Sequence, residues 1–377
     1  MRILHANALE SPDLVDGVNA AIWTAAREQA AMGHDVGLVL GDPTREAWAF
    51  AERHGVQLHV MGPTLRRYAQ DLRRALAQPP DVVHLHSTFA PRLAIATELA
   101  GRACVPIVAT PHGGLRPHLR GDGSWRQGVY ARLVERRRLR RAAVVTALLP
   151  AEAEDLHGFL LQYAGRIAMV HSPVDPPGGT LTTRDTPLGT GPMVFLGRLD
   201  IHIKGIDHLL DIARRMPTTA FELYGEGPDR ERLVRSHPPN VSILEPAFRA
   251  DKAQVLARAG LYLQTSRFEA FGISVGEAML AGLPCAISET MDLAPLFTEH
   301  HLGMVLPTDA DEAADALTAA LADRPQLRTW AETAAAYAEQ HFTSEAVASG
   351  YVDAYRTAQH LSDGRAEPSD AGPRKRM

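Results

Sequence analysis

Short runs of β-branched and other apolar residues alternate along this chain with longer segments whose apolar residues recur at helical spacing. The segment before Gly33, for example, carries Ile22, Ala25 and Ala26, as one face of a helix does. Strands that alternate with helices form βαβ units and a parallel sheet. The runs are apolar on both faces, so we expect helices on both sides of each sheet. The predicted strands lie near 2–5, 36–40, 57–60, 81–85, 106–109, 143–147 and 167–170, and then near 193–196, 220–224, 241–244, 260–264, 284–287 and 303–306.

Residues 172–192 interrupt this alternation because they are dense in Pro, Gly and Thr, which form neither a helix nor a central strand. We interpret them as a linker between an N-terminal domain, 1–172, and a C-terminal domain, 188–343. Two α/β domains joined in this way bind ligands in a cleft beside the carboxyl ends of their strands. Residues 361–377 contain almost no apolar residue and are predicted to be a disordered tail.

The composition suits two globular domains, with 377 residues of which 45% are hydrophobic and 22% charged. The net charge of -5 gives no basic field that would favour nucleic acid. Cys104 and Cys285 stand in apolar runs and are predicted to be core thiols of a reducing compartment. The N-terminus lacks the pattern of a signal peptide, and no run reaches the roughly 18 apolar residues of a membrane span. We therefore expect a cytoplasmic protein, and the abundance of Ala and Arg favours a bacterial source.

The stretch RFEAFGISVGEAML, residues 267–280, follows an apolar strand and leads into an apolar helical run. A helix that begins near Gly272 or Ile273 offers unpaired amides and the positive end of its dipole to a diphosphate. Glu277, about one turn inside, is expected to bind ribose hydroxyls. Glu269 precedes the turn, and since a carboxylate repels phosphate, its expected partner is a sugar hydroxyl. Either glutamate alone would more often be a surface carboxylate, whereas the pair in this setting favours a site.

A second stretch, residues 193–213, ends a strand at Gly197 and then places Arg198 and Lys204 before a helical pattern. Fixed cations there would stabilise the charge that builds on a leaving diphosphate, so we expect no metal and no other cofactor. In LYGEGPDRERL, residues 223–233, the glycines around Gly225 would leave space for a base or ribose, although such a segment alone is more often only a turn.

In this order, GRLD…KG, YGEGP and FEAFG…GEAM resemble the retaining GT-B glycosyltransferases of family 4. The Glu-x7-Glu element of that family is matched by Glu269 and Glu277. The resemblance implies α/β architecture with two facing Rossmann-like doubly wound parallel-sheet domains, and metal-independent transfer from a nucleoside diphosphate sugar with retention of configuration. It adds Phe271, Gly272 and Ile273 to the expected donor site. It also implies that a C-terminal helix, 344–360, packs back onto the first domain.

The first half is expected to hold the acceptor side. Gly17, the one glycine of SPDLVDGVNAAI, stands where the family carries a glycine-rich loop, and it can start a helix that faces the donor phosphate. His86 matches the family's cleft histidine and is expected to position the sugar in the transition state. His84 lies one strand period away and should point to the same face, so the two roles are interchangeable at this point. A satisfied core histidine is the alternative for His86.

Two further segments belong to this half. In TPHGGLRP, residues 110–117, His112 and Gly113 are expected to contact the acceptor, or else to form only a turn. Residues 126–141 form a basic helix candidate that would meet an anionic acceptor or a membrane surface at most peripherally. A solvated helix face is the simpler interpretation, because its apolar positions are few.

The predicted function is therefore transfer of a hexose from a nucleotide sugar, UDP first and GDP second, to a hydroxyl of a glycan, a lipid-linked sugar or a small natural product. The alternatives are a GT-B epimerase or a non-catalytic nucleotide-sugar-binding protein. A phosphorylase would need a lysine for pyridoxal phosphate, for which no clear candidate is seen. A dehydrogenase would need G-x-G-x-x-G after the first strand, which HANALESPDLVDG does not contain. The sequence fixes neither the acceptor nor the oligomeric state.

Overall fold

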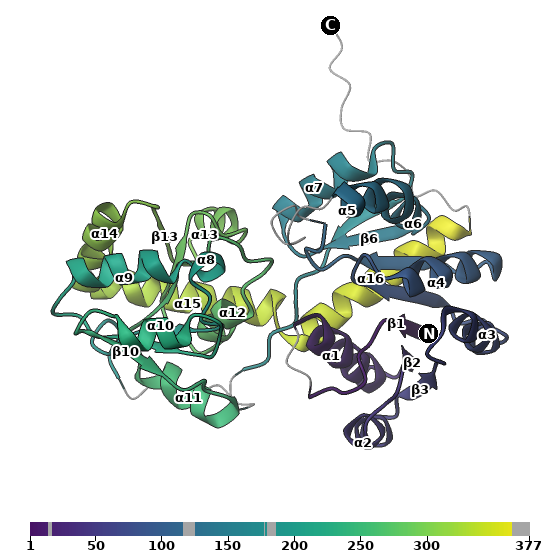
Figure 1. Ribbon diagram of the computed structural model, residues 1–377, viewed down its shortest axis with the longest axis horizontal. Coiled ribbons are helices and arrows are strands. Elements are labelled where there is room, and N and C mark those ends of the chain that lie inside the picture. Colours follow the sequence, from purple (N-terminus) through teal and green to yellow (C-terminus); the bar gives the residue numbers. More distant parts are fainter. Residues whose placement is uncertain (14–16, 116–124, 177, 179–185, 364–377) are drawn as a thin grey trace, which may run out of the picture. The chain divides into compact units, whose positions relative to one another are not determined.

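A computed structural model of the chain describes residues 1–13, 17–115, 125–176, 178 and 186–363. The chain divides into two compact units, which Figure 1 shows as two groups of helices, each around a sheet. The first unit comprises residues Met1–Val170 and Ala348–Met377, and the second comprises His171–Val347. Each unit is considered by itself below.

The first unit contains a seven-stranded sheet in the order β3-β2-β1-β4-β5-β6-β7, with every strand parallel to its neighbours. Its strands are β1 (Arg2–Ala6), β2 (Asp35–Leu40), β3 (Gln57–Val60), β4 (Val82–His86), β5 (Ile107–Thr110), β6 (Val144–Ala147) and β7 (Arg166–Met169). Its helical segments are α1 (Gly17–Ala31), α2 (Arg45–His54), α3 (Leu65–Ala75), α4 (Pro91–Arg102), α5 (Trp125–Tyr130), the π-helix η2 (Ala131–Glu135), α6 (Arg136–Leu139) and α7 (Pro150–Leu160). The long helix α16 (Ser344–Ser362) begins in the second unit and continues in the first.

The second unit contains a six-stranded parallel sheet in the order β10-β9-β8-β11-β12-β13. Its strands are β8 (Met193–Leu196), β9 (Phe221–Tyr224), β10 (Val241–Leu244), β11 (Leu261–Gln264), β12 (Cys285–Ser288) and β13 (Met304–Leu306). Its helices are α8 (Ile201–Lys204), α9 (Ile206–Arg215), α10 (Arg230–Arg235), α11 (Arg249–Arg258), α12 (Ile273–Leu280), α13 (Ala294–His300), α14 (Ala310–Ala322) and α15 (Arg324–His341).

Both strand orders reverse direction beside the first strand of the sheet, which is the doubly wound, Rossmann-like topology. The predicted fold class of two Rossmann-like parallel-sheet domains is therefore confirmed. Every predicted strand is present, and its ends lie within one residue of the predicted range. Among the described residues, none of the helices combines the length and the hydropathy needed to cross a membrane.

The two faces of the first sheet differ in character. One face is apolar and joins a core cluster that includes Leu4, Val83, Leu85, Ile107 and Val145. The opposite face carries a row of fully buried polar side chains on the four central strands, namely His5, His84, His86, Thr110 and Thr146. The parallel register sets these residues side by side, since His5 pairs with His84 and His86 pairs with Thr110.

Two expectations need correction. Leu361 and Ser362, which were expected in a disordered tail, form the exposed last turn of α16, in continuous hydrogen-bonded helix with the buried residues before them; residues 364–377 lie outside the described part. Cys104, which was expected in the core, is exposed, whereas Cys285 is buried. Cys104 lies where α4 ends and the chain turns toward β5 with a left-handed φ of 55°, so its apolar neighbours do not cover it. Part of the predicted linker, residues 177 and 179–185, is also outside the described residues.

The entry into the second sheet depends on two glycines whose backbones touch. A Cβ on Gly191 would lie 2.1 Å from the carbonyl oxygen of Arg258, and one on Gly260 would lie 2.5 Å from that of Gly191. Gly191→Ala should therefore lower the free energy of unfolding by at least about 2 kcal/mol, because backbone atoms would have to move. Urea denaturation measures this change.

A matched control for that substitution is Gly101→Ala. Gly101 lies inside α4, and a Cβ there would meet nothing within 4 Å. It should stabilise the protein by about 0.5–1 kcal/mol, since alanine restricts the unfolded chain and favours the helix. Equal effects of the two alanines would contradict the close approach of Gly191 and Gly260.

Candidate functional site

The carboxyl end of β11 and the short helix α8 meet at a glycine. Gly205 separates α8 from α9 with a left-handed φ of 59°, and a Cβ there would lie 2.1 Å from the carbonyl oxygen of Thr265. The Thr265 hydroxyl donates to the carbonyl oxygen of Gly205 over 3.0 Å. Only glycine permits this approach, and it fixes the preceding residue, Lys204, beside the end of β11.

The Lys204 ammonium forms an ion pair with the carboxylate of Glu269. Both side chains are largely shielded, at 16% and 18% exposed. Gln264 and Ser266, from the end of β11 and the residues after it, lie 3.4 Å from the same carboxylate oxygen. The sequence predicted separate partners for these two residues, a phosphate for Lys204 and a sugar hydroxyl for Glu269. In the structure they are each other's partner.

Arg198 lies at the same edge of the sheet, in the loop after β8. Its side chain is exposed, and within the described residues its guanidinium makes no hydrogen bond and no ion pair. Arg267, by contrast, forms a bidentate pair with Asp207, with both N–O distances 2.8 Å, and so braces the loop against α9. Arg198 is therefore a cation available to an anionic ligand at this edge.

Helix α12 begins at Ile273, as predicted, with Gly272 as its N-cap. Gly272 has a φ of 80°, and no side chain caps the helix, so its first amides are open to an anion. Phe271 is only 3% exposed and packs its ring against Phe342 and His171, with centroids 4.9 and 5.8 Å apart. Phe271 is thus a core residue, and only its backbone is available to a donor.

Glu277 from α12 is held by a lysine that the sequence did not single out. The Lys252 ammonium on α11 donates to both carboxylate oxygens, at 2.8 and 2.9 Å. Burial raises the pKa of the Glu277 carboxyl, while the Lys252 ammonium opposes this shift and the negative charge of Asp175 adds to it. Each glutamate of the Glu-x7-Glu pair therefore has its own lysine.

The glycines after β8 and β9 do not leave the space that was expected for a base or ribose. A Cβ on Gly225 would lie 1.8 Å from the carbonyl oxygen of Gly197, and one on Gly227 would lie 2.4 Å from that of Leu199. The loop after β8 already fills this space, so Gly225 and Gly227 are needed for packing of backbone on backbone. Gly197 donates its N–H to the Tyr224 carbonyl over 3.0 Å, which ties the two strand ends together.

In the first unit, the buried row of polar side chains forms a continuous hydrogen-bond chain. His86 Nδ1 lies 3.1 Å from His112 Nε2, and His86 Nε2 lies 2.9 Å from His5 Nδ1. His5 Nε2 lies 2.7 Å from the amide oxygen of Gln29 on α1. We call His112, His86, His5 and Gln29 the histidine chain. His84 and His86 share one face, as predicted, with ring centroids 3.8 Å apart.

The exposures of these histidines differ in a way that bears on function. His5, His84 and His86 are fully buried, whereas His112 is partly exposed. Burial lowers the pKa of His5 and of His112 to about 4, and it lowers those of His84 and His86 well below their usual value. All are therefore neutral near pH 7. His86 lies beneath His112, and His112 is the member of the histidine chain that a ligand can reach.

Glu152 holds the loop that carries His112. The backbone N–H of Gly113 donates to the Glu152 carboxylate over 2.6 Å, and the N–H of Leu148 donates to its other oxygen over 2.7 Å. His112 and Gly113 both have left-handed φ angles, 53° and 72°. The loop is thus more than a free turn, because a buried carboxylate fixes its backbone.

His5, His84 and His86 each have a ring nitrogen within 4.8 Å of the others, close enough to hold a metal ion together. Every ring nitrogen of the three already has a hydrogen-bond partner, however. A metal would have to break several of these bonds. The geometry therefore favours a hydrogen-bonded network over a metal centre.

The remaining predicted segments of the first unit are less decisive. Gly17 is exposed and is the first residue of α1; residues 14–16 before it lie outside the described part. The predicted basic helix, 126–141, is divided into α5, η2 and α6. Leu133 is 68% exposed, whereas Glu135 and Arg138 are buried as an ion pair, 2.7 Å apart. Its contact with an anionic acceptor or a membrane stays a prediction.

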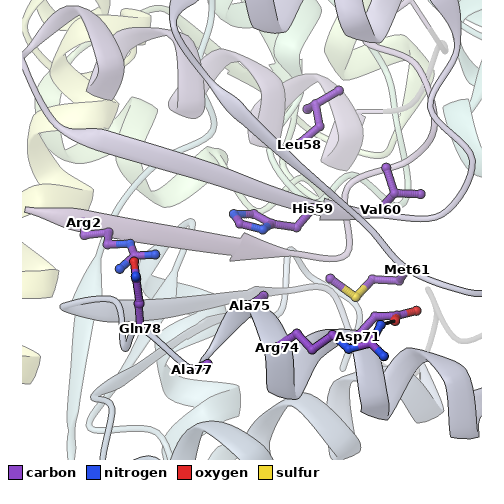
Figure 2. Close-up of a pocket in the computed structure, with 10 residues that line it drawn as sticks. All are labelled: Arg2, Leu58, His59, Val60, Met61, Asp71, Arg74, Ala75, Ala77 and Gln78. Carbon is purple, nitrogen blue, oxygen red and sulfur yellow. Dashed lines mark hydrogen bonds and ion pairs between the residues drawn. The ribbon is translucent and has the colours of Figure 1, made fainter.

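A cavity of about 570 Å³ opens beside the edge strand β3, and Figure 2 shows Arg2 next to Gln78 and Arg74 next to Asp71 around it. None of the residues predicted from the sequence lines it. Its charged groups also have partners already, since Arg74 pairs with Asp71 over 3.1 Å and Arg2 with Asp35 over 3.9 Å. We therefore do not assign this cavity to the predicted site.

Two family models match this chain. The model described as a glycosyl transferase 4-like domain matches residues 16–173, and the model described as glycosyl transferases group 1 matches residues 192–323. The chain belongs to the glycosyltransferase 4-like family. Each half of this glycosyltransferase thus matches a glycosyltransferase family model, and the predicted resemblance is confirmed.

Individual relatives of this glycosyltransferase are distant. The lipopolysaccharide glucosyltransferase WaaG of Escherichia coli (strain K12) is 26% identical over 149 residues, which are 37% of this chain and 40% of WaaG. Two solved structures, each 19% identical, show the same fold. Anabaena Alr3699/HepE in complex with UDP and glucose has a TM-score of 0.70 over 95% of this chain and all of its own. The sucrose-phosphate synthase of Thermosynechococcus elongatus has a TM-score of 0.73 over 94% and 98%.

Sequence reasoning missed several residues of this glycosyltransferase that support the predicted ones. Lys252 stands in a helix with no motif around it. Gln29 and Glu152 look like ordinary helix residues until the fold brings them to His5 and Gly113. A signal was nevertheless present, because one or two polar residues stand near the end of each of the otherwise apolar strands β1, β4, β5 and β6.

The Lys252–Glu277 pair gives a direct test. Lys252→Met removes the ammonium that opposes the effect of burial, so the pKa of Glu277 should rise further above its usual range. NMR titration of the ¹³C-labelled glutamate carboxyls measures it. Lys252→Arg keeps the positive charge and should leave the pKa close to that of the unmodified chain. An unchanged Glu277 pKa in Lys252→Met would show that the pair does not act as described.

Proposed function

We propose that this chain transfers a hexose from a nucleoside diphosphate sugar to a hydroxyl of an acceptor. The observation that carries the proposal is the Lys204–Glu269 ion pair at the carboxyl edge of the second sheet, together with Arg198 at the same edge, which has no anionic partner in the described part of the chain. The uncapped start of α12 supplies amides for the diphosphate there. These groups suit a ligand that combines negative charge with hydroxyls, as a sugar nucleotide does.

In the proposed reaction the bond between the anomeric carbon and the diphosphate breaks, and its electron pair leaves with the phosphate oxygen. The acceptor hydroxyl forms the new bond to the same carbon, and its proton passes to the leaving phosphate. Arg198 and Lys204 stabilise the negative charge that develops on the diphosphate. This charge is larger in the transition state than in the ground state, so the two cations stabilise the transition state more. Glu269 orients Lys204 and binds a sugar hydroxyl, and Glu277 binds the ribose.

UDP is the first choice of nucleotide and GDP the second. The HepE complexes with UDP and with UDP-glucose support the uridine nucleotide, although this chain is only 19–20% identical to that protein. We further propose that the anomeric configuration is retained, as the family resemblance implies. We also propose that transfer needs no metal, because two cations already serve the diphosphate.

The acceptor side is assigned to the first unit, through His112 and Gly113. The proposed acceptors are a glycan, a lipid-linked sugar or a small natural product with a free hydroxyl. The partial similarity to WaaG supports the first two. A cytoplasmic location is proposed as well, since Cys104 and Cys285 are free thiols, which suits a reducing compartment.

Nucleotide binding is the first test. UDP, GDP, ADP and TDP and their common sugars are titrated by calorimetry in the presence of EDTA. One base should bind in the micromolar range without metal, and Arg198→Ala should weaken its binding by about 10-fold or more, as expected for the loss of a charge-assisted contact. If no nucleotide binds, or if only metal restores binding, the proposed donor site is wrong.

Turnover tests the ion pair. Glu269→Ala and Lys204→Ala should each lower kcat by at least about 100-fold, as happens when one donor to a transition-state charge is lost. The assay follows UDP release from the nucleotide sugar that calorimetry identifies. His202→Ala is the matched control, because His202 is exposed on the same short helix and should leave the rate within about 2-fold. A near-normal kcat in a folded Glu269→Ala variant would show that the site assignment is wrong.

A further inference from the structure

The direction of the histidine chain follows from the group at its inner end. An amide oxygen accepts hydrogen bonds and cannot donate them. Since Gln29 presents its oxygen to His5 Nε2 over 2.7 Å, that ring nitrogen carries the hydrogen. A neutral imidazole has one N–H and one lone pair, so His5 Nδ1 is an acceptor.

The same rule of one donor and one acceptor applies to each following ring, first to His86 and then to His112. His86 Nε2 must donate to His5 Nδ1, which leaves His86 Nδ1 as an acceptor, and His112 Nε2 must then donate to it. His112 Nδ1 is left with a lone pair. Within the described residues it has no hydrogen-bond partner, and His112 is the partly exposed member of the chain. The histidine chain therefore ends in a neutral hydrogen-bond acceptor at its outer end.

The Gln29 amide also has a partner on its other side. Its nitrogen donates to the Tyr355 hydroxyl on α16 over 3.1 Å, and this hydroxyl lies 2.8 Å from His84 Nδ1. His84 Nε2 lies 2.7 Å from the Thr110 hydroxyl. Turning the carboxamide over would exchange its oxygen and nitrogen and would reverse every donor along the chain. The tautomer of His112 is thus tied to a glutamine three hydrogen bonds away.

We propose that Gln29, His5 and His86 are positioning residues that hold His112 in the Nε2–H tautomer, so that its Nδ1 accepts a hydrogen bond from a sugar hydroxyl of the substrate. A lone pair on a neutral ring complements an uncharged donor and repels a phosphate oxygen. At this position the ring therefore favours a hydroxyl over a phosphate oxygen. The hydroxyl contact rests on the proposed function, whereas the tautomer does not.

The tautomer is measured on the full chain without any ligand. Long-range ¹H–¹⁵N correlation spectra of the ¹⁵N-labelled protein distinguish Nδ1 from Nε2 protonation for each histidine. His5, His86 and His112 should each show the Nε2–H form near pH 7. The Nδ1–H form or an imidazolium at His112 in the unmodified chain would overturn the proposal, and so would stoichiometric Zn²⁺ binding at His5, His84 and His86.

Two variants then locate the cause. Gln29→Met keeps the size of the side chain but removes the amide, so His112 should lose its single tautomer and show both forms. Thr146→Val is the matched control, since Thr146 is equally buried and bonds to Thr110, on the far side of His84. It should leave the tautomer of His112 unchanged. A single Nε2–H form in Gln29→Met would overturn the role of Gln29, and should that variant not fold, the spectrum of the unmodified chain still decides.

The effect of the substitution on activity is measured with UDP-glucose as the probe. Gln29→Met should lower kcat/KM for UDP release by about 10-fold, the loss expected for one misdirected hydrogen bond, while the Kd of UDP alone stays the same. A changed tautomer with unchanged kcat/KM would overturn the hydroxyl contact and leave the transferase assignment standing. If the unmodified chain shows the Nε2–H tautomer but binds no nucleotide sugar, the proposed function and the hydroxyl contact both fail, and the tautomer lock alone is supported.

Discussion

A buried polar atom without a hydrogen-bond partner costs about 1–3 kcal/mol, and this cost governs how the first unit is built. Its central strands carry His5, His84 and His86 on a face that is fully closed to solvent. Within the sheet, His5 and His86 bond to each other and His84 bonds to Thr110, so the loop that carries His112 and two helices supply the other partners. Gln29 comes from α1 and Tyr355 from α16, and a hydrogen bond joins the two. The polar row thereby fixes both helices on the sheet, with the same bonds that orient the imidazoles.

In the second unit, the shielded polar groups that need partners are charged side chains instead of neutral rings. Lys204 and Lys252 each neutralise one glutamate of the Glu-x7-Glu pair, and each pair is partly shielded. Removing one partner of such a pair would leave the other charge uncompensated. The two sheets therefore present different chemistry at their carboxyl edges. The first has neutral acceptors and donors that suit hydroxyls, and the second has cations and helix amides that suit phosphates.

Much of this could be predicted from the sequence, because strands and helix starts are local properties. All the strands and the start of α12 were found from periodicity and turn residues, and the shared face of His84 and His86 follows from the period of a strand. The contacts that could not be predicted join residues that are far apart along the chain. Gln29 and Tyr355 are 326 residues apart, and no local pattern joins them. Gly225 was expected to leave space, but whether a glycine faces a cavity or another backbone depends on which loop lies opposite.

The pairing of Lys204 with Glu269 was missed for another reason, which also explains how both can serve a diphosphate ligand. Each residue was considered alone, so the carboxylate was placed away from phosphate and the ammonium beside it. An ion pair removes the conflict, since a carboxylate neutralised by a lysine no longer repels a nearby phosphate. An ammonium has three N–H donors, and a carboxylate does not use them all. In the proposed reaction, the pair therefore keeps Glu269 close to the sugar while Lys204 still donates to the leaving group. Arg198, which has no anionic partner within the described residues, adds a further positive charge at this edge.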